Sequence, residues 1–297
     1  MTPDILLLGS AFDPVLVAVA EMLGARSTTL SIRHARLEDL AAAHWCHRVG
    51  SDGAETEVRD GAGRALRGAR TAVLNRLRYE PALLFTRMTM ADRDYARAEF
   101  HALLMSWLAG PTDCCINAAT ASGLAGPALR PWQWLAAAQA AGLAVAPART
   151  GSSTRRRRHA AGEGRLPGMV ERRDLVPLFA DPAWDAGGLN RPYGEAAVPD
   201  EVIRIEVVGG IAHPPPESAH VPTSLSSAAG RLAQSVGADI LAVELGRFGN
   251  ADWRFMAADP MPPQLGLGSI TGIADRLLRS VGDCSTALEV VGTEGSQ

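Results

Sequence analysis

The sequence has few of the features that mark several common classes of protein. Its four cysteines include no C-x-x-C pair, so neither a disulfide scaffold nor a thiolate metal site is indicated. No stretch approaches the roughly 20 apolar residues that a membrane-spanning helix needs. The short run Ile5–Leu8 follows an acid and a proline rather than basic residues, which is typical of a buried strand and not of a signal peptide. We therefore predict a soluble, cytoplasmic protein with reduced thiols.

Neither a charge of one sign nor aromatic residues dominate the composition. The 29 basic residues nearly balance 32 acidic ones, and a formal net charge of -3 argues against bulk binding to nucleic acid or to an acidic membrane. Aromatic residues make up 5% of the chain, whereas the hydrophobic class makes up 47%. This composition supports a buried core and favours helices packed on a sheet over an all-β sandwich.

The first half of the chain alternates segments of strand and helix character. Asp13 is placed to cap a helix that begins at Pro14. The stretch 50–68, rich in Gly, Asp and Arg, indicates a hairpin or loop. Strands are expected at 5–9, 28–32, 70–77, 114–117 and 143–147, and helices at 14–23, 92–108 and 131–141. This alternation predicts an α/β fold with a mostly parallel sheet.

The second half opens with a basic stretch that lacks this pattern. Residues 148–191 hold nine arginines against five acids and include the run Arg155–Arg158, which predicts a linker or a small, weakly specified subdomain. Order resumes with a hairpin that turns at Gly209-Gly210. It is followed by an expected helix at 222–236, strands at 240–245 and 253–257, a helix at 273–281 and a flexible tail at 286–297.

Three passages between residues 115 and 272 carry motifs that occur in series along the chain. The first runs from Cys115-Ile116-Asn117 to Gly142-Leu143-Ala144-Val145-Ala146-Pro147-Ala148-Arg149-Thr150. The second leads from Tyr193-Gly194-Glu195 into the alternating strand and hairpin Val202–Gly210. The third comprises 229–237, 240–245 and 253–260, followed by Thr271-Gly272. Together they resemble the ATP-grasp superfamily, and within it the carboxylate–amine and peptide ligases related to glutathione synthetase and the ligases that modify ribosomal peptides.

The resemblance implies a particular domain organisation and a partner. It implies a Rossmann-like preceding domain over 1–110 and an ATP-grasp-like domain over 111–285, within which 148–191 would be a shortened nucleotide lid. It also implies ATP and Mg²⁺ as cofactors and a peptide or protein as partner. Whether the protein forms a homodimer is left open by the resemblance.

The resemblance further implies roles for individual residues. Arg204 would contact a phosphate or the acyl phosphate, and Glu195 would lie near the adenine or ribose. Glu244 and Asp259 would be metal ligands, because Mg²⁺ prefers hard oxygen donors. Arg130 stands near the place of a lysine that holds the nucleotide.

Arg155 and Arg156, in the basic stretch, are candidates for an anion site that takes nucleotide phosphates or an acidic peptide. The same run, Arg155–Arg158, is also what a solvated loop would carry. Other readings stay open for the remaining candidates: a solvated arginine for Arg204, an arginine partner for Glu244, and a plain turn for Asp259-Pro260. Gly9-Ser10 follows a strand, but the P-loop pattern G-x-x-x-x-G-K-[ST] is absent.

The sequence departs from the family pattern at three places that bear on chemistry. Ala257 occupies the position of the metal-bridging glutamate and has no oxygen to offer. Residues 148–191 contain no lysine, although the family places a phosphate-binding lysine there. Arg130 replaces a further lysine, and a planar guanidinium is not equivalent to a compact ammonium.

These departures lead to two main hypotheses for the function. The first is a degenerate or non-catalytic ATP-grasp-like protein that binds a peptide or protein partner in a ligase or peptide-modification pathway. The alternative is an active ATP- and Mg²⁺-dependent carboxylate–amine ligase that forms an acyl phosphate. A third reading is a small-molecule-binding α/β protein whose resemblance is architectural.

Overall fold

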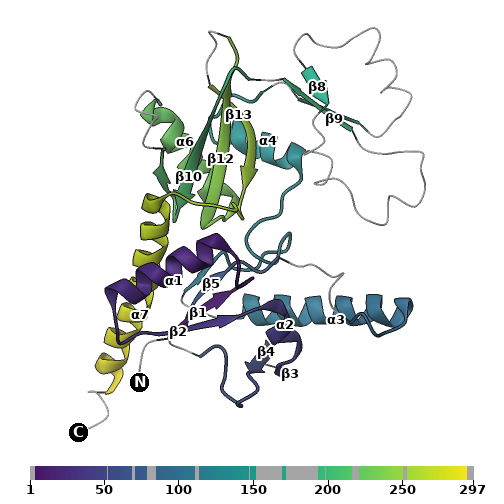
Figure 1. The fold of residues 1–297 in the computed structure, drawn as a ribbon, viewed down its shortest axis with the longest axis vertical. Coiled ribbons are helices and arrows are strands. Elements are labelled where there is room, and N and C mark those ends of the chain that lie inside the picture. The colour runs from purple at the N-terminus through teal and green to yellow at the C-terminus, as the bar shows by residue number, and fades with distance from the viewer. Residues whose placement is uncertain are drawn as a thin grey trace. The chain divides into compact units, whose positions relative to one another are not determined.

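The computed structural model shows a protein of mixed helix and strand content with parallel and antiparallel sheets (Figure 1). It describes residues 4–51, 53–68, 71–78, 85–110, 114–146, 148–151, 169–171, 193–197, 199–215, 221–249 and 253–292. Contacts divide the chain into two compact units. The first consists of Met1–Ala128, Gly237–Leu241 and Pro260–Gln297, and the second of Leu129–Val236 and Ala242–Asp259. The expected domains 1–110 and 111–285 stay a prediction.

A parallel sheet forms the centre of the first unit. Its strands are β1 (Asp4–Leu8), β2 (Ser31–Ala35), β5 (Thr71–Asn75) and β6 (Cys115–Ile116), in the order β2-β1-β5-β6. The strands β1 and β5 are buried nearly throughout, as expected where both faces of a parallel sheet are covered. The predicted strands at 5–9, 70–77 and 114–117 are confirmed, whereas the second strand lies three residues later than the expected 28–32.

The helices α1 (Pro14–Arg26) and α7 (Leu267–Gly292) contact each other, and α7 also contacts β1 and β5. The Asp13 carboxylate caps α1 by accepting from the Val15 N–H at 2.9 Å, as the sequence predicts. α7 is much longer than the expected 273–281. Burial of apolar residues such as Ile270 and Ile273 outweighs the low helix propensity of the glycines near its start. Residues 286–292 of the expected tail are helical, and 293–297 lie outside the described residues.

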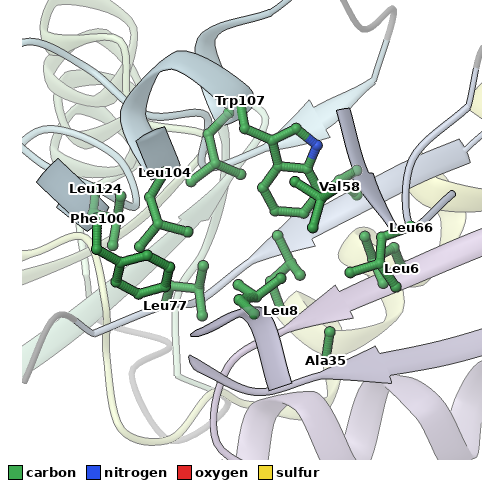
Figure 2. Close-up of a cluster of buried hydrophobic side chains, with 13 residues drawn as sticks. Leu6, Leu8, Ala35, Val58, Leu66, Leu77, Phe100, Leu104, Trp107 and Leu124 are labelled. Atoms are coloured by element: carbon green, nitrogen blue, oxygen red, sulfur yellow. The ribbon is translucent and has the colours of Figure 1, made fainter. Parts of the chain in front are cut away.

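The other face of the parallel sheet packs on α3 (Met90–Ala109). Leu6 and Leu8 of β1 lie in one apolar cluster with Phe100, Leu104 and Trp107 of α3 (Figure 2). Full burial of each such leucine stabilises the fold by about 1.5–3 kcal/mol. The short helix α2 (Leu37–Ala41) and a hairpin of β3 (His44–Gly50) and β4 (Gly53–Arg59) complete this side. The hairpin begins at His44, before the expected 50–68.

An antiparallel sheet forms the main part of the second unit. Its strands are β10 (Glu201–Val208), β11 (Ile211–His213), β12 (Ile240–Arg247) and β13 (Trp253–Asp259), in the order β11-β10-β12-β13. The predicted turn at Gly209-Gly210 is confirmed: both residues have positive φ, 58° and 81°, which glycine adopts without strain. α6 (Thr223–Val236) contacts β10, α4 (Pro131–Ala140) contacts β13, and the two helices contact each other. They therefore cover the same face of this sheet.

A smaller sheet in the second unit contains β7 (Ala148–Gly151), β8 (Met169–Glu171) and β9 (Tyr193–Ala197), in the order β7-β9-β8. Of the expected strand at 143–147, the described residues 143–146 form only an isolated bridge. Val145 makes this single parallel bridge to Phe255, and the Ala146 N–H donates to the Phe255 carbonyl at 2.8 Å. The shortened lid predicted over 148–191 falls mostly outside the described residues and stays a prediction.

Candidate functional site

Strand β10 separates its apolar and charged side chains between its two faces. Ile203, Ile205 and Val207 are buried, whereas Arg204 and Glu206, which alternate with them, are half-buried. Since α6 packs on β10, the buried row faces the helices and the charged row lies on the opposite face. Arg204 Nε lies 3.8 Å from Glu206 Oε1. A cation is thus held beside a carboxylate on the face that the helices leave uncovered.

The register of β12 and β13 places the two expected metal ligands on one face. Glu244 lies directly opposite Ala257, and Ala242 lies directly opposite Asp259. The two carboxylate positions are therefore diagonal neighbours, whose Cα atoms in such sheets are about 7–8 Å apart. The register shifts after Glu244, so that Leu245 pairs with the fully buried Phe255 on the helix-covered face. We call the opposite surface, with Arg204, Glu206, Glu244, Ala257 and Asp259, the Glu244 face.

The Glu244 carboxylate is half-buried in an otherwise buried strand. Within the described residues it makes no hydrogen bond or ion pair, so the arginine partner that the sequence left open is not found there. Those residues also contain no group of three or more His, Cys, Asp or Glu side chains that could hold a metal ion. Ala257, between the two carboxylate positions, supplies no ligand atom. The described residues alone therefore do not supply three protein ligands for Mg²⁺.

Two further sequence candidates, Arg130 and Glu195, lie on other elements of the second unit. Arg130 is exposed at the N-cap of α4, where its backbone carbonyl accepts from the N–H groups of Gln133 and Trp134 at 2.8 and 3.0 Å. Glu195 of β9 is paired in register with Arg149 on one side and Glu171 on the other. Arg155 and Arg156 lie outside the described residues, so the anion site expected there stays a prediction.

Two features of the site were not identified from the sequence motifs. Glu206 neighbours Arg204 on the same face of β10, a placement that the alternation of the strand could have indicated. The second feature is a property of the whole chain: all 29 of its basic residues are arginine, so there is no lysine at any position. The absence of a phosphate-binding lysine from 148–191 is therefore not compensated elsewhere in the sequence.

No protein-family model matches the chain, and no curated protein matches it. Among solved structures, the chain is similar to macrocyclase MdnC of Microcystis aeruginosa MRC bound with precursor peptide MdnA. The TM-score is 0.68 at 14% identity, over 93% of this chain and 99% of that chain. It is also similar to ATP-grasp ligase PsnB complexed with minimal precursor, Mg and ADP. Here the TM-score is 0.62 at 18% identity, over 94% of this chain and 98% of that chain.

A third similar structure is a RiPP-associated ATP-grasp ligase of Chryseobacterium gregarium in complex with ADP and a leader and core peptide. The TM-score is 0.63 at 10% identity, over 93% of this chain and 96% of that chain. At such low identity the likeness establishes the fold. The chain shares the fold of these ATP-grasp structures, which is the fold that the resemblance of its sequence implies. No helix among the described residues is long and apolar enough to cross a membrane.

Proposed function

We propose that this chain is an ATP-grasp-like protein without ligase activity of its own, which binds a peptide or protein partner in a peptide-modification pathway. One observation carries the proposal: Ala257 stands directly opposite Glu244, where the sequence resemblance expects the metal-bridging glutamate. Two further properties support it, the lack of a three-ligand metal cluster among the described residues and the lack of lysine in the whole sequence.

The chemistry of the ligase reaction explains why these losses matter. Transfer of a phosphoryl group to a carboxylate is accelerated mainly by positioning and by neutralising the charge on the phosphate oxygens. A metal ion and lysine ammonium groups normally supply that neutralisation. An arginine such as Arg204 supplies a cation, but it does not replace a divalent ion bridged between two carboxylates.

The partner is inferred from the relatives and from charge. MdnC was solved with precursor peptide MdnA, and the Chryseobacterium gregarium ligase with a leader and core peptide. In this chain the stretch 148–191 has nine arginines against five acids, within a total of -3. A local excess of guanidinium groups favours an acidic peptide through paired hydrogen bonds to its carboxylates.

A second candidate function, an active ATP- and Mg²⁺-dependent carboxylate–amine ligase, is favoured by Glu244. A half-buried carboxylate without a partner among the described residues is suited to a cation. Mg²⁺ is commonly held by one or two carboxylates together with substrate phosphates, so Glu244 and Asp259 would suffice once a nucleotide is bound. In that case the amine would attack an acyl phosphate and release phosphate.

Calorimetric titration of the full chain with a non-hydrolysable ATP analogue, with and without Mg²⁺, separates the two candidates. We expect no Mg²⁺-dependent binding by the natural sequence at millimolar analogue. Micromolar, Mg²⁺-dependent binding that is lost in both Arg204→Ala and Glu244→Ala would overturn the proposal in favour of the active ligase.

A matched pair of variants tests the observation on which the proposal depends. Ala257→Glu restores a carboxylate opposite Glu244, and we expect it to create Mg²⁺-dependent analogue binding. Ala257→Gln has nearly the same size without the charge, and it should create none. Equal behaviour of the two variants would show that position 257 does not limit metal binding. An acidic precursor-like peptide should bind the natural sequence equally well with and without nucleotide.

A further inference from the structure

Strand β3 (His44–Gly50) of the first unit is a regular strand with one unpaired edge. It is seven residues long, and it pairs with β4 from His44 opposite Arg59 to Gly50 opposite Gly53 without a bulge. The sheet that contains it consists of these two strands, so on its other side β3 has no partner strand among the described residues. The backbone N–H and C=O groups along such an edge can pair with a further strand.

One face of the hairpin is fixed to the core of the first unit. Trp45 lies directly opposite Val58 of β4, which is buried in the apolar cluster with α3 (Figure 2). The indole ring of Trp45 makes edge contacts with the rings of Phe100 and Trp107, at centroid distances of 5.8 and 5.9 Å. Because these contacts hold β3 in place, its edge is ordered before any partner binds.

The edge of β3 lacks most of the features that protect edge strands from pairing with other chains. Every residue of the strand is exposed except Trp45, which is half-buried. The strand contains no proline, its ladder has no bulge, and Arg48 is its only residue with a permanent charge. The side chain of Val49 is 77% exposed. A long, regular and largely uncharged edge of this kind favours association.

The sequence of β3 is complementary to itself in one antiparallel register. When His47 lies opposite His47 of a second copy, Trp45 lies opposite Val49 of that copy, and Cys46 lies opposite its Arg48. An aromatic side chain then faces a β-branched one at both ends of the ladder, a pairing that stabilises sheets. A shift of the register by two residues places either Arg48 opposite Arg48 or Trp45 opposite His47. The first register therefore combines apolar pairs with the absence of facing arginines.

This register has the symmetry that two identical chains require. Its pairs are the same when the two copies are exchanged, so a two-fold axis passes between the two residues at position 47. We propose that two copies of this chain associate by antiparallel pairing of their β3 strands, with His47 at the axis. The two hairpins then form one continuous sheet in the order β4-β3-β3-β4. This inference concerns the first unit and does not rest on the function proposed for the chain.

The size of the contact sets the expected affinity. A ladder of seven residues from each copy buries less surface than the roughly 1,600 Å² of a standard stable interface. We therefore expect a reversible equilibrium between monomer and dimer, with a dissociation constant in the micromolar range. Sedimentation equilibrium of the full chain, at concentrations from about 1 μM to about 1 mM, measures this constant.

A charge exchange at the exposed His47 tests both the interface and its register. His47→Arg and His47→Asp each place two like charges directly opposite one another at the axis, so each variant should dimerise at least about tenfold more weakly. An equimolar mixture of the two variants brings opposite charges together and should restore dimers that contain one chain of each kind. Native mass spectrometry distinguishes these mixed dimers by mass. If the mixture dimerises no better than either variant alone, the register is wrong.

A matched pair of substitutions assigns the interface to β3. Val49 of β3 and Val17 of α1 are both exposed, at 77% and 43%. Val49→Asp replaces the apolar partner of Trp45 in the second copy by a carboxylate and should weaken the dimer at least about tenfold. Val17→Asp introduces the same charge outside the strand and should leave the dissociation constant unchanged. Equal effects of the two substitutions would refute an interface at β3.

Two further outcomes would overturn the proposal. A chain that is still monomeric at about 1 mM does not form this interface. If the amides of β3 become protected from hydrogen exchange only when an acidic precursor-like peptide is added, the edge binds an extended peptide and not a second copy. Because none of these variants lies on the Glu244 face, a monomeric chain would leave the proposed function untouched.

Discussion

Arg76 of the first unit and the charged side chains of the Glu244 face in the second unit all lie at sheets, but the structure holds them differently. Arg76 is fully buried and bonded to both a carboxylate and a backbone carbonyl. Glu244 is half-buried and has no partner among the described residues, and Arg204 lies 3.8 Å from Glu206. In the first unit the charge of Arg76 is part of the buried structure, whereas we expect substitution of Glu244 to have little structural consequence. On such a face, the side chains that a reaction needs can be substituted while the sheet stays folded.

The largest effect that this comparison predicts is on Arg76. Arg76→Met should lower the free energy of unfolding by about 4 kcal/mol, because it leaves Asp13 without its buried partner. Unfolding in urea measures the change. Arg78→Met, at the exposed neighbour, should stay within about 0.5 kcal/mol. If both variants lower the free energy of unfolding by the same amount, the buried charge of Arg76 does not stabilise the fold more than an exposed one. Adding Asp13→Asn to Arg76→Met should recover part of the loss.

A somewhat smaller loss is expected at Asn117, a buried residue of the first unit with φ of 59°. Its Oδ1 accepts from the Ile240 N–H at 3.1 Å, and its Nδ2 donates to the Pro260 carbonyl at 3.2 Å. Asn117→Ala should cost about 3 kcal/mol in urea unfolding, from two unsatisfied backbone groups and a strained φ. Asn117→Gly relieves the strain alone and should cost about 1 kcal/mol less. A larger loss in Asn117→Gly than in Asn117→Ala would show that the strained φ does not contribute to the cost.

Cys115 and Cys46 provide a comparison within the first unit. Burial raises the pKa of the Cys115 thiol to about 12, whereas Cys46 is exposed. At pH 8, alkylation by iodoacetamide, followed by mass spectrometry of the peptides, should modify Cys46 at least about tenfold faster, because the thiolate is the reactive form. Equal rates would show that Cys115 is accessible in solution.

The same pKa shift has a consequence for stability. Above the ordinary thiol pKa of 9.0, the unfolded chain loses the Cys115 proton while the folded chain retains it. The free energy of unfolding should therefore fall as pH rises from 9.0 toward about 12. In Cys115→Ala this part of the alkaline loss should disappear, which repeated urea unfolding across that pH range would reveal.

The smallest effect is expected on the Glu244 face. Glu244→Ala should change the free energy of unfolding by no more than about 0.5 kcal/mol, because it removes a carboxylate that no described residue binds. A loss of several kcal/mol in this variant would remove the contrast between the two units and would point to a structural role for this face.

Features that depend on neighbouring residues could be predicted from the sequence, whereas most pairings between distant residues could not. Asp13 and Pro14 mark the start of α1 because a cap and a fixed φ act within a few residues. The strands around Glu244 and Ala257 were expected from their apolar residues and the motif, but their pairing, with its register shift after Glu244, was not predicted. The burial of Arg76 was not predicted, because its partners Asp13 and Pro262 are distant in the sequence. Gly9-Ser10 was set aside for lack of a P-loop motif, yet these residues line a pocket of about 330 Å³ at the carboxyl ends of β1, β2 and β5.

The contacts of α7 bear on how the chain folds during its synthesis. Ile273 and Leu277 of this helix are fully buried, and the helix contacts α1, β1 and β5 of the N-terminal sheet. Ile240 and Pro260, which Asn117 binds, also belong to the first unit. A nascent chain therefore exposes the apolar surface of α1 and β1 until α7 leaves the ribosome. Truncation before α7 should release a chain that aggregates, and we expect a fragment made by cutting the gene after Ala128 not to fold its sheet.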